Sequence, residues 1–164
     1  MRGLVRVGAG AASLGGVLRI VSTFIPYQAN LAWLEALYGV IDLCLMFGLI
    51  AVYLATAEAT GAFGLAAFVV ALAGVASIVG PDTAVLGVDF YRVGALVFVT
   101  GLAGLSVMLV IGGVMRLCAT LWIASFASAL ASAALPQALT AAGLALGLGY
   151  IVAGAGMWRA RGVT

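Results

Sequence analysis

The chain is a succession of long apolar runs separated by short breaks that contain glycine, proline or charged residues. A run of about 20 apolar residues, at about 1.5 Å of helix rise each, is long enough to span the hydrocarbon of a bilayer. Proline and Gly-Pro breaks mark several of the boundaries, as expected at helix ends. The pattern predicts an all-α domain, a polytopic bundle of six transmembrane helices at residues 8–25, 31–56, 61–80, 93–113, 117–135 and 137–158.

Small residues recur at positions where helices could approach closely. Residues 8–16 read GAGAASLGG, and Gly143 and Gly147 stand four residues apart. Small residues at such spacing let helix backbones pack against each other within a membrane. We therefore expect these glycines to serve packing rather than ligand binding.

The run at 31–56 is almost entirely apolar, yet it contains two acids, Glu35 and Asp42. They are seven residues apart, so they lie on one helix face with Tyr38 between them. An acid at the centre of a membrane helix costs roughly 2.5 kcal/mol or more, and it usually faces protein or water. The pattern therefore predicts a polar site on this helix.

Composition narrows the class of protein. Of 164 residues, 66% are hydrophobic and 7% are charged, whereas soluble domains average about 25% charged residues. The chain therefore indicates an integral membrane protein in contact with the lipid bilayer, and its abundant alanine and glycine suggest a bacterial cytoplasmic membrane. A net charge of +2 without a basic patch argues against nucleic acid as a partner.

Histidine and lysine are absent, which excludes His-based metal sites, Schiff-base lysines and His-based triads. Two isolated cysteines, Cys44 and Cys118, are typical of small core residues. We therefore expect no metal and no cofactor.

The distribution of arginines along the chain predicts how the protein is oriented in the membrane. With six spans, both termini lie on one side of the membrane, and most arginines fall on that side, whereas Arg92 falls in the longest loop on the other. Positively charged residues favour the cytoplasmic side, so we expect both termini to be cytoplasmic. The arginines on that side are Arg2, Arg6, Arg116, Arg159 and Arg161.

Arg19 lies about 10 Å inside the outer end of its run, between the depths of Glu35, about 6 Å, and Asp42, about 16 Å. One interpretation is an ion pair of Arg19 with either acid, which would hold the first two helices together. The other is an outward-facing cavity bounded by the first, second and fourth helices. Arg19 can neutralise one acid only, and the surplus acid favours the cavity.

The loop at residues 81–92 would cover this cavity and would add Asp89 and Arg92 to its ligand-binding residues, which are Arg19, Glu35, Tyr38, Asp42, Asp89 and Arg92. Asp89 and Arg92 could equally be a solvated pair at the start of the fourth helix.

Three functions fit the pattern. The first is binding or transport of a small-molecule or lipid-like ligand. In span number, length and small-residue first helix, the chain resembles the substrate-binding subunits of energy-coupling factor vitamin transporters, which implies a membrane partner subunit.

The second function is that of a membrane enzyme with Glu35 and Asp42 as catalytic residues. A carboxyl in an apolar pocket can act as a proton donor in isomerisation, cyclisation or epoxide opening of an isoprenoid-like substrate. The third is an accessory subunit of a membrane complex.

Overall fold

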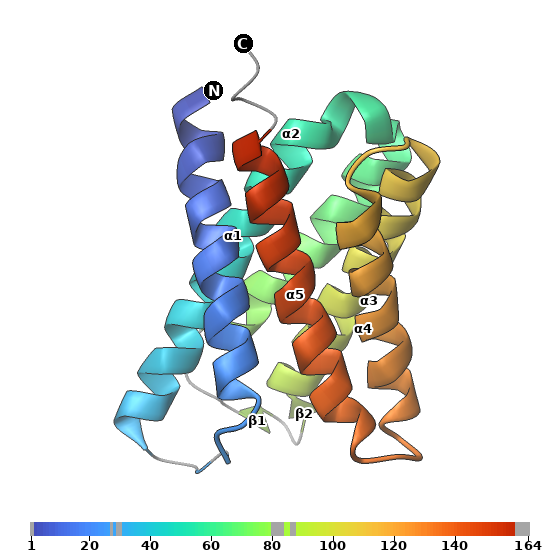
Figure 1. Ribbon diagram of the computed structural model, residues 1–164. Coiled ribbons are helices and arrows are strands. Elements are labelled where there is room, and N and C mark those ends of the chain that lie inside the picture. The colour runs from blue at the N-terminus through green and yellow to red at the C-terminus, as the bar shows by residue number, and fades with distance from the viewer. Residues whose placement is uncertain (1, 27, 29–30, 80–83, 86–87, 160–164) are drawn as a thin grey trace.

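The computed structural model describes residues 2–26, 28, 31–79, 84–85 and 88–159, and for residues 2, 84–85 and 88–89 it describes the backbone alone. This part of the chain is all-α apart from one small hairpin (Figure 1). Strands β1 (Ala84–Val85) and β2 (Val88–Asp89) pair antiparallel, with Ala84 opposite Asp89. The helices are α1 (Arg2–Ser22), α2 (Ala32–Ile78), α3 (Phe90–Ile111), α4 (Arg116–Ala131) and α5 (Ala138–Arg159).

Length and composition make α1, α2, α3 and α5 candidates for crossing a membrane. Helix α4, with 16 residues, is shorter. By the length and composition of its helices, the expectation of a helical membrane protein is confirmed. The expected boundaries shift, because α1 begins at Arg2 rather than at residue 8, and α3 begins at Phe90 rather than at residue 93.

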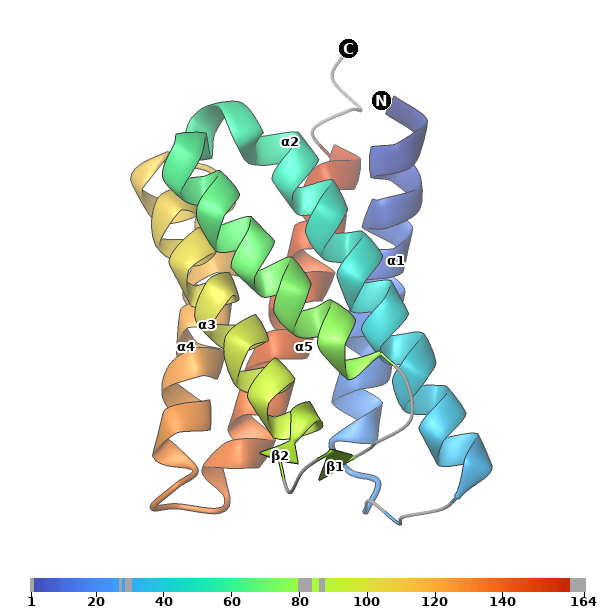
Figure 2. The ribbon, with the colours of Figure 1, turned by 180° about the vertical axis from the view of Figure 1, so that it is seen from behind.

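Helix α2 contains 47 residues, which in a straight helix would measure about 70 Å. Instead it reverses direction at Gly61, where φ is 60° and ψ is −157°. Glycine adopts this conformation without the steric penalty of a Cβ atom. The first arm, residues 32–60, rises to one end of the bundle, and the second arm, residues 62–78, runs back (Figure 2). The separate turn expected at residues 57–60 is wrong, because the helix continues through them and bends at Gly61.

The helices form a closed ring. Helix α1 packs against α5 and α2, the longest contact joins α2 to α3, and α4 lies between α3 and α5. The first turn of α1 and the last turn of α5 lie at one end of the bundle, here called the termini end (Figure 1). The β1–β2 hairpin lies at the opposite end, here called the hairpin end.

Glycines bring α1 and α5 together. A Cβ built on Gly147 would lie 2.6 Å from the carbonyl oxygen of Gly16, and one built on Gly16 would lie 2.5 Å from the carbonyl oxygen of Gly147. Gly143 likewise faces Thr23 of the segment after α1. The packing role expected for these small residues is confirmed, although Gly143 also lines the cavity described below.

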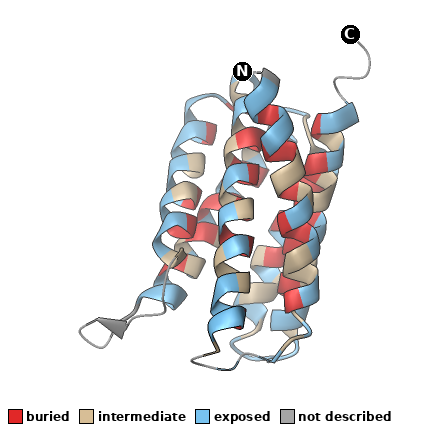
Figure 3. Ribbon diagram, turned by 90° about the vertical axis from the view of Figure 1, so that its left-hand side faces the viewer, coloured by how far each residue is buried: buried red, intermediate tan, exposed pale blue. Residues whose placement is uncertain are grey.

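Large side chains fill the middle of the ring. Trp122 and Tyr150 are fully buried, and their ring centroids lie 5.0 Å apart. Outward faces are apolar too, with Val7, Phe63 and Ile111 each at least 70% exposed. Figure 3 shows buried residues turned inward and exposed residues turned outward on the same helices. Such an exterior is compatible with contact to lipid.

Candidate functional site

A cavity of about 870 Å³ occupies the hairpin half of the bundle. All five helices contribute to its lining, through the last turns of α1 and α4, the first turns of α2, α3 and α5, and Ile78 at the end of α2. The sequence predicts three walls, from α1, α2 and α3, and the structure adds α4 and α5. The ring arrangement causes this difference, because every helix of a ring borders its centre.

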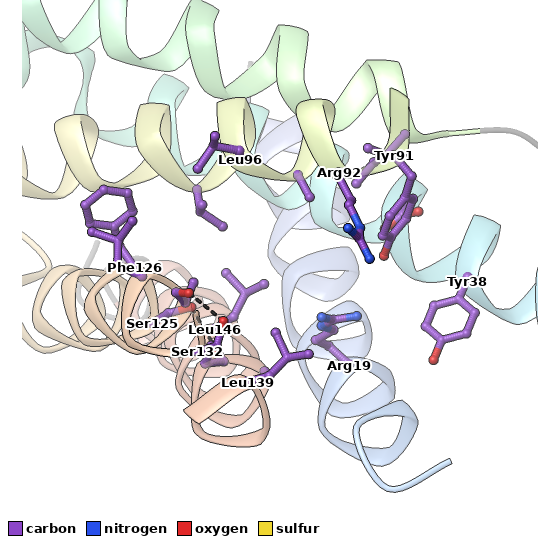
Figure 4. Close-up of a pocket in the computed structure, with 18 of the residues that line it drawn as sticks. Arg19, Tyr38, Tyr91, Arg92, Leu96, Ser125, Phe126, Ser132, Leu139 and Leu146 are labelled. Carbon is purple, nitrogen blue, oxygen red and sulfur yellow. Dashed lines mark hydrogen bonds between the residues drawn. The ribbon is translucent and has the colours of Figure 1, made fainter. Parts of the chain in front are cut away.

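Polar residues gather on one side of this cavity. Figure 4 shows Arg19, Tyr38, Tyr91 and Arg92 together, apart from the apolar residues of α4 and α5. Of the six residues expected to bind a ligand, five line the cavity: Arg19, Glu35, Tyr38, Asp42 and Arg92. The side chain of Asp89 lies outside the described residues, as do residues 80–83 and 86–87 of the expected cover.

The two acids occupy different environments. Glu35 is exposed in the first turn of α2, where the positive end of the helix dipole favours a carboxylate. Asp42 lies two turns deeper and is only 6% exposed. The shared face and the greater depth of Asp42 agree with the seven-residue spacing. The dipole of α2 therefore favours a charge on Glu35, whereas Asp42 lies too far along the helix for this effect.

Arg19 lies in the last turn of α1, half-buried, where the negative end of the dipole favours a cation. Its carbonyl oxygen accepts hydrogen bonds from the hydroxyls of Ser22, at 2.9 Å, and Thr23, at 2.8 Å, which tie down the end of the helix. The side chain interacts electrostatically with Asp42 and Tyr91. Its Nε atom is buried and has no hydrogen-bond partner.

Among the described residues, no salt bridge joins Arg19 to Glu35 or Asp42, so the expected direct ion pair is wrong. The guanidinium of Arg19 points into the cavity, toward that of Arg92 on α3 (Figure 4). The guanidinium group of Arg19 therefore lies in the cavity and not in the contact between α1 and α2.

The opposite side of the cavity is apolar, with Leu96 from α3, Phe126 from α4, and Leu139 and Leu146 from α5. Next to them, the hydroxyl of Ser125 donates a 2.9 Å hydrogen bond to a carbonyl oxygen of α5, drawn as a dashed line in Figure 4. This bond holds α4 and α5 together at the cavity wall.

Sequence reasoning missed this apolar wall and also Tyr91. The wall carries no signal, because its leucines look like every other leucine in an apolar run. Tyr91 did carry a sequence signal, because it stands beside Arg92 at the start of a helix.

No family model matches this chain, and the searches of curated proteins and of solved structures also find no match.

Proposed function

We propose that this chain is a six-span integral membrane protein with an outward-facing cavity that binds or transports a small or lipid-like ligand. One observation carries the proposal. Ionisable side chains from α1, α2 and α3 converge on a cavity of about 870 Å³, within the range of about 300–1,000 Å³ typical of ligand sites. Charged groups are costly in a membrane and mark functional sites unless a partner explains them, and Arg19 and Asp42 form no direct pair.

The proposed topology counts each arm of α2 as a span and includes the shorter α4. The two arms run in opposite directions, which supports this count (Figure 2). Arg6, Arg116 and Arg159 stand near the termini end, and Arg92 stands at the hairpin end. By the positive-inside rule the termini are then cytoplasmic, and the cavity occupies the outer half of the membrane. A bacterial cytoplasmic membrane is part of the proposal.

Paired amide substitutions test the binding role. Asp42→Asn and Glu35→Gln each remove a charge and preserve shape. Purified parent and variants would be compared by mass spectrometry of the small molecules that copurify with them. We expect Asp42→Asn to lose the copurifying ligand, because Asp42 is buried in the cavity, and Glu35→Gln to retain most of it, because Glu35 is exposed and stabilised by its helix. Retention by both variants at the parent level would contradict the proposal.

Asp42 also supports a second candidate, a carboxylate-dependent enzyme. This nearly buried acid shares a cavity with an apolar wall, a setting in which a carboxyl can donate a proton to an isoprenoid-like substrate. Catalytic conversion of an added substrate, rather than stoichiometric retention, would favour the enzyme. A parent protein that copurifies with no ligand would instead favour the third role, an accessory subunit whose partner it binds.

A further inference from the structure

Charges of both signs line the polar side of the cavity. Arg19 and Arg92 contribute two positive charges. Glu35 and Asp42 contribute two negative charges, so the formal charges of the described lining residues balance. Accepting the proposed binding function, we infer that the ligand is a neutral amphiphile, a molecule with an uncharged hydroxyl head group and a long apolar chain.

The charged groups of the cavity already interact with one another. Arg19 donates a hydrogen bond to the hydroxyl of Tyr91 and interacts electrostatically with Asp42. Tyr38 and Arg92 also interact with other groups. A ligand with a net charge would meet groups of its own sign on this side of the cavity, and an unbalanced charge removed from water is costly. A neutral head group avoids this cost.

The hydroxyl group is indicated by Asp42. This acid lines the cavity and is only 6% exposed, and among the described residues no group donates a hydrogen bond to its carboxylate. Buried polar groups are nearly always hydrogen-bonded in folded proteins. A hydroxyl can donate to Asp42 and, unlike an ammonium group, can also accept from the guanidinium of Arg19, which points into the cavity (Figure 4). One hydroxyl therefore suits both residues.

The long chain is indicated by the apolar side of the cavity, which includes Leu96, Phe126, Leu139 and Leu146 (Figure 4). Leu96 is 55% exposed and Leu139 is 62% exposed, although both line the cavity. A hydrocarbon chain that lies against these side chains removes their apolar surface from water, and the bilayer around the bundle is a source of such chains.

Probes that share one chain and differ only in the head group test the inference. The parent protein in phosphatidylcholine nanodiscs would be titrated with radiolabelled oleyl alcohol, oleyl phosphate, oleyl trimethylammonium and the hydrocarbon octadecene, and binding to nanodiscs without protein would be subtracted. We expect the alcohol to bind at least about tenfold more tightly than each other probe, because a hydrogen bond to a charged group contributes about that factor in affinity. Equal or tighter binding of the anion, the cation or the hydrocarbon would overturn the inference.

Charge variants show whether the head group lies between Arg19 and Asp42. Asp42→Asn removes a negative charge, so it should bind the alcohol less tightly and shift the preference toward oleyl phosphate by about fivefold or more. Arg19→Gln should shift the preference toward oleyl trimethylammonium by a similar factor, whereas Arg19→Lys, which keeps the charge, should not. Arg116→Gln is the control, because this arginine lies outside the cavity lining at the opposite end of the bundle.

Shifts of opposite sign cannot come from a general loss of folding, which lowers the binding of every probe alike. Parent-like preferences in both Asp42→Asn and Arg19→Gln would refute the assigned position of the head group.

This inference and the proposed function fail in different ways. If the parent copurifies with a ligand that depends on Asp42, yet prefers a charged probe or the hydrocarbon, the inference falls and the binding function stands. If the parent neither copurifies with a ligand nor binds any probe, both fall.

Discussion

The glycine contact between α1 and α5 supports a quantitative prediction for Gly147→Ala. A Cβ at this position would lie 2.6 Å from the carbonyl oxygen of Gly16, and ordinary van der Waals contact begins at 3.4 Å, so the helices must separate locally by about 0.8 Å. The other near atoms belong to Ile20, whose Cγ1 would lie at 2.7 Å. The backbone oxygen cannot rotate away, and overpacking of this kind costs about 1–3 kcal/mol.

Gly156→Ala is the matched control. It makes the same substitution in the same helix, and a Cβ there would meet no atom within 4 Å. Both variants gain similar helix propensity, up to about 1 kcal/mol, so their difference isolates the packing cost. Because Arg19 lies three residues after Gly16 and Leu146 adjoins Gly147, a shift between α1 and α5 should also change the cavity.

The assay is thermal unfolding in detergent, followed by circular dichroism. At about 2–4 °C per kcal/mol for a chain of this size, Gly147→Ala should melt about 2–12 °C below Gly156→Ala. Weaker retention of the copurifying ligand by Gly147→Ala should accompany the lower Tm. Equal melting temperatures for the two variants would show that α1 and α5 do not approach as closely as the structure has them.

Three further predictions follow from particular residues. With the native cysteines replaced, Leu135→Cys should be labelled by a membrane-impermeant thiol reagent from outside and Glu58→Cys only from the cytoplasm; the reverse pattern would reject the topology. Gly61→Ala should lower stability by about 1–3 kcal/mol in denaturation experiments, because φ of 60° with ψ of −157° is open to glycine alone; an unchanged midpoint would contradict the bend. Ser125→Ala should cost about 0.5–1.5 kcal/mol by losing a buried 2.9 Å hydrogen bond between helices, whereas Thr120→Ala, whose exposed hydroxyl bonds within its own helix, should cost less.

Local sequence already determined the membrane class, the approximate helices and the shared face of Glu35, Tyr38 and Asp42. These features depend on composition and on the helical repeat, which act over a few residues. The length of an apolar run sets whether it can span a bilayer, and a spacing of seven residues sets which side chains share a face. The cost of burying an acid in hydrocarbon made this face a candidate site.

Only the tertiary structure decided which helices wall the cavity and where Arg19 points. Leu146 lines the cavity and Leu148, two residues later, is 45% exposed on the outer face, yet both occupy the same apolar run. Phe126 of the cavity wall and Phe63, which is 78% exposed, are equally indistinguishable by sequence. In a soluble protein, contact with water would mark the outer face with polar residues. Lipid chains are as apolar as a protein core, so the inward and outward faces of a membrane helix have the same composition. Only the packing of neighbouring helices decides which apolar residues face inward.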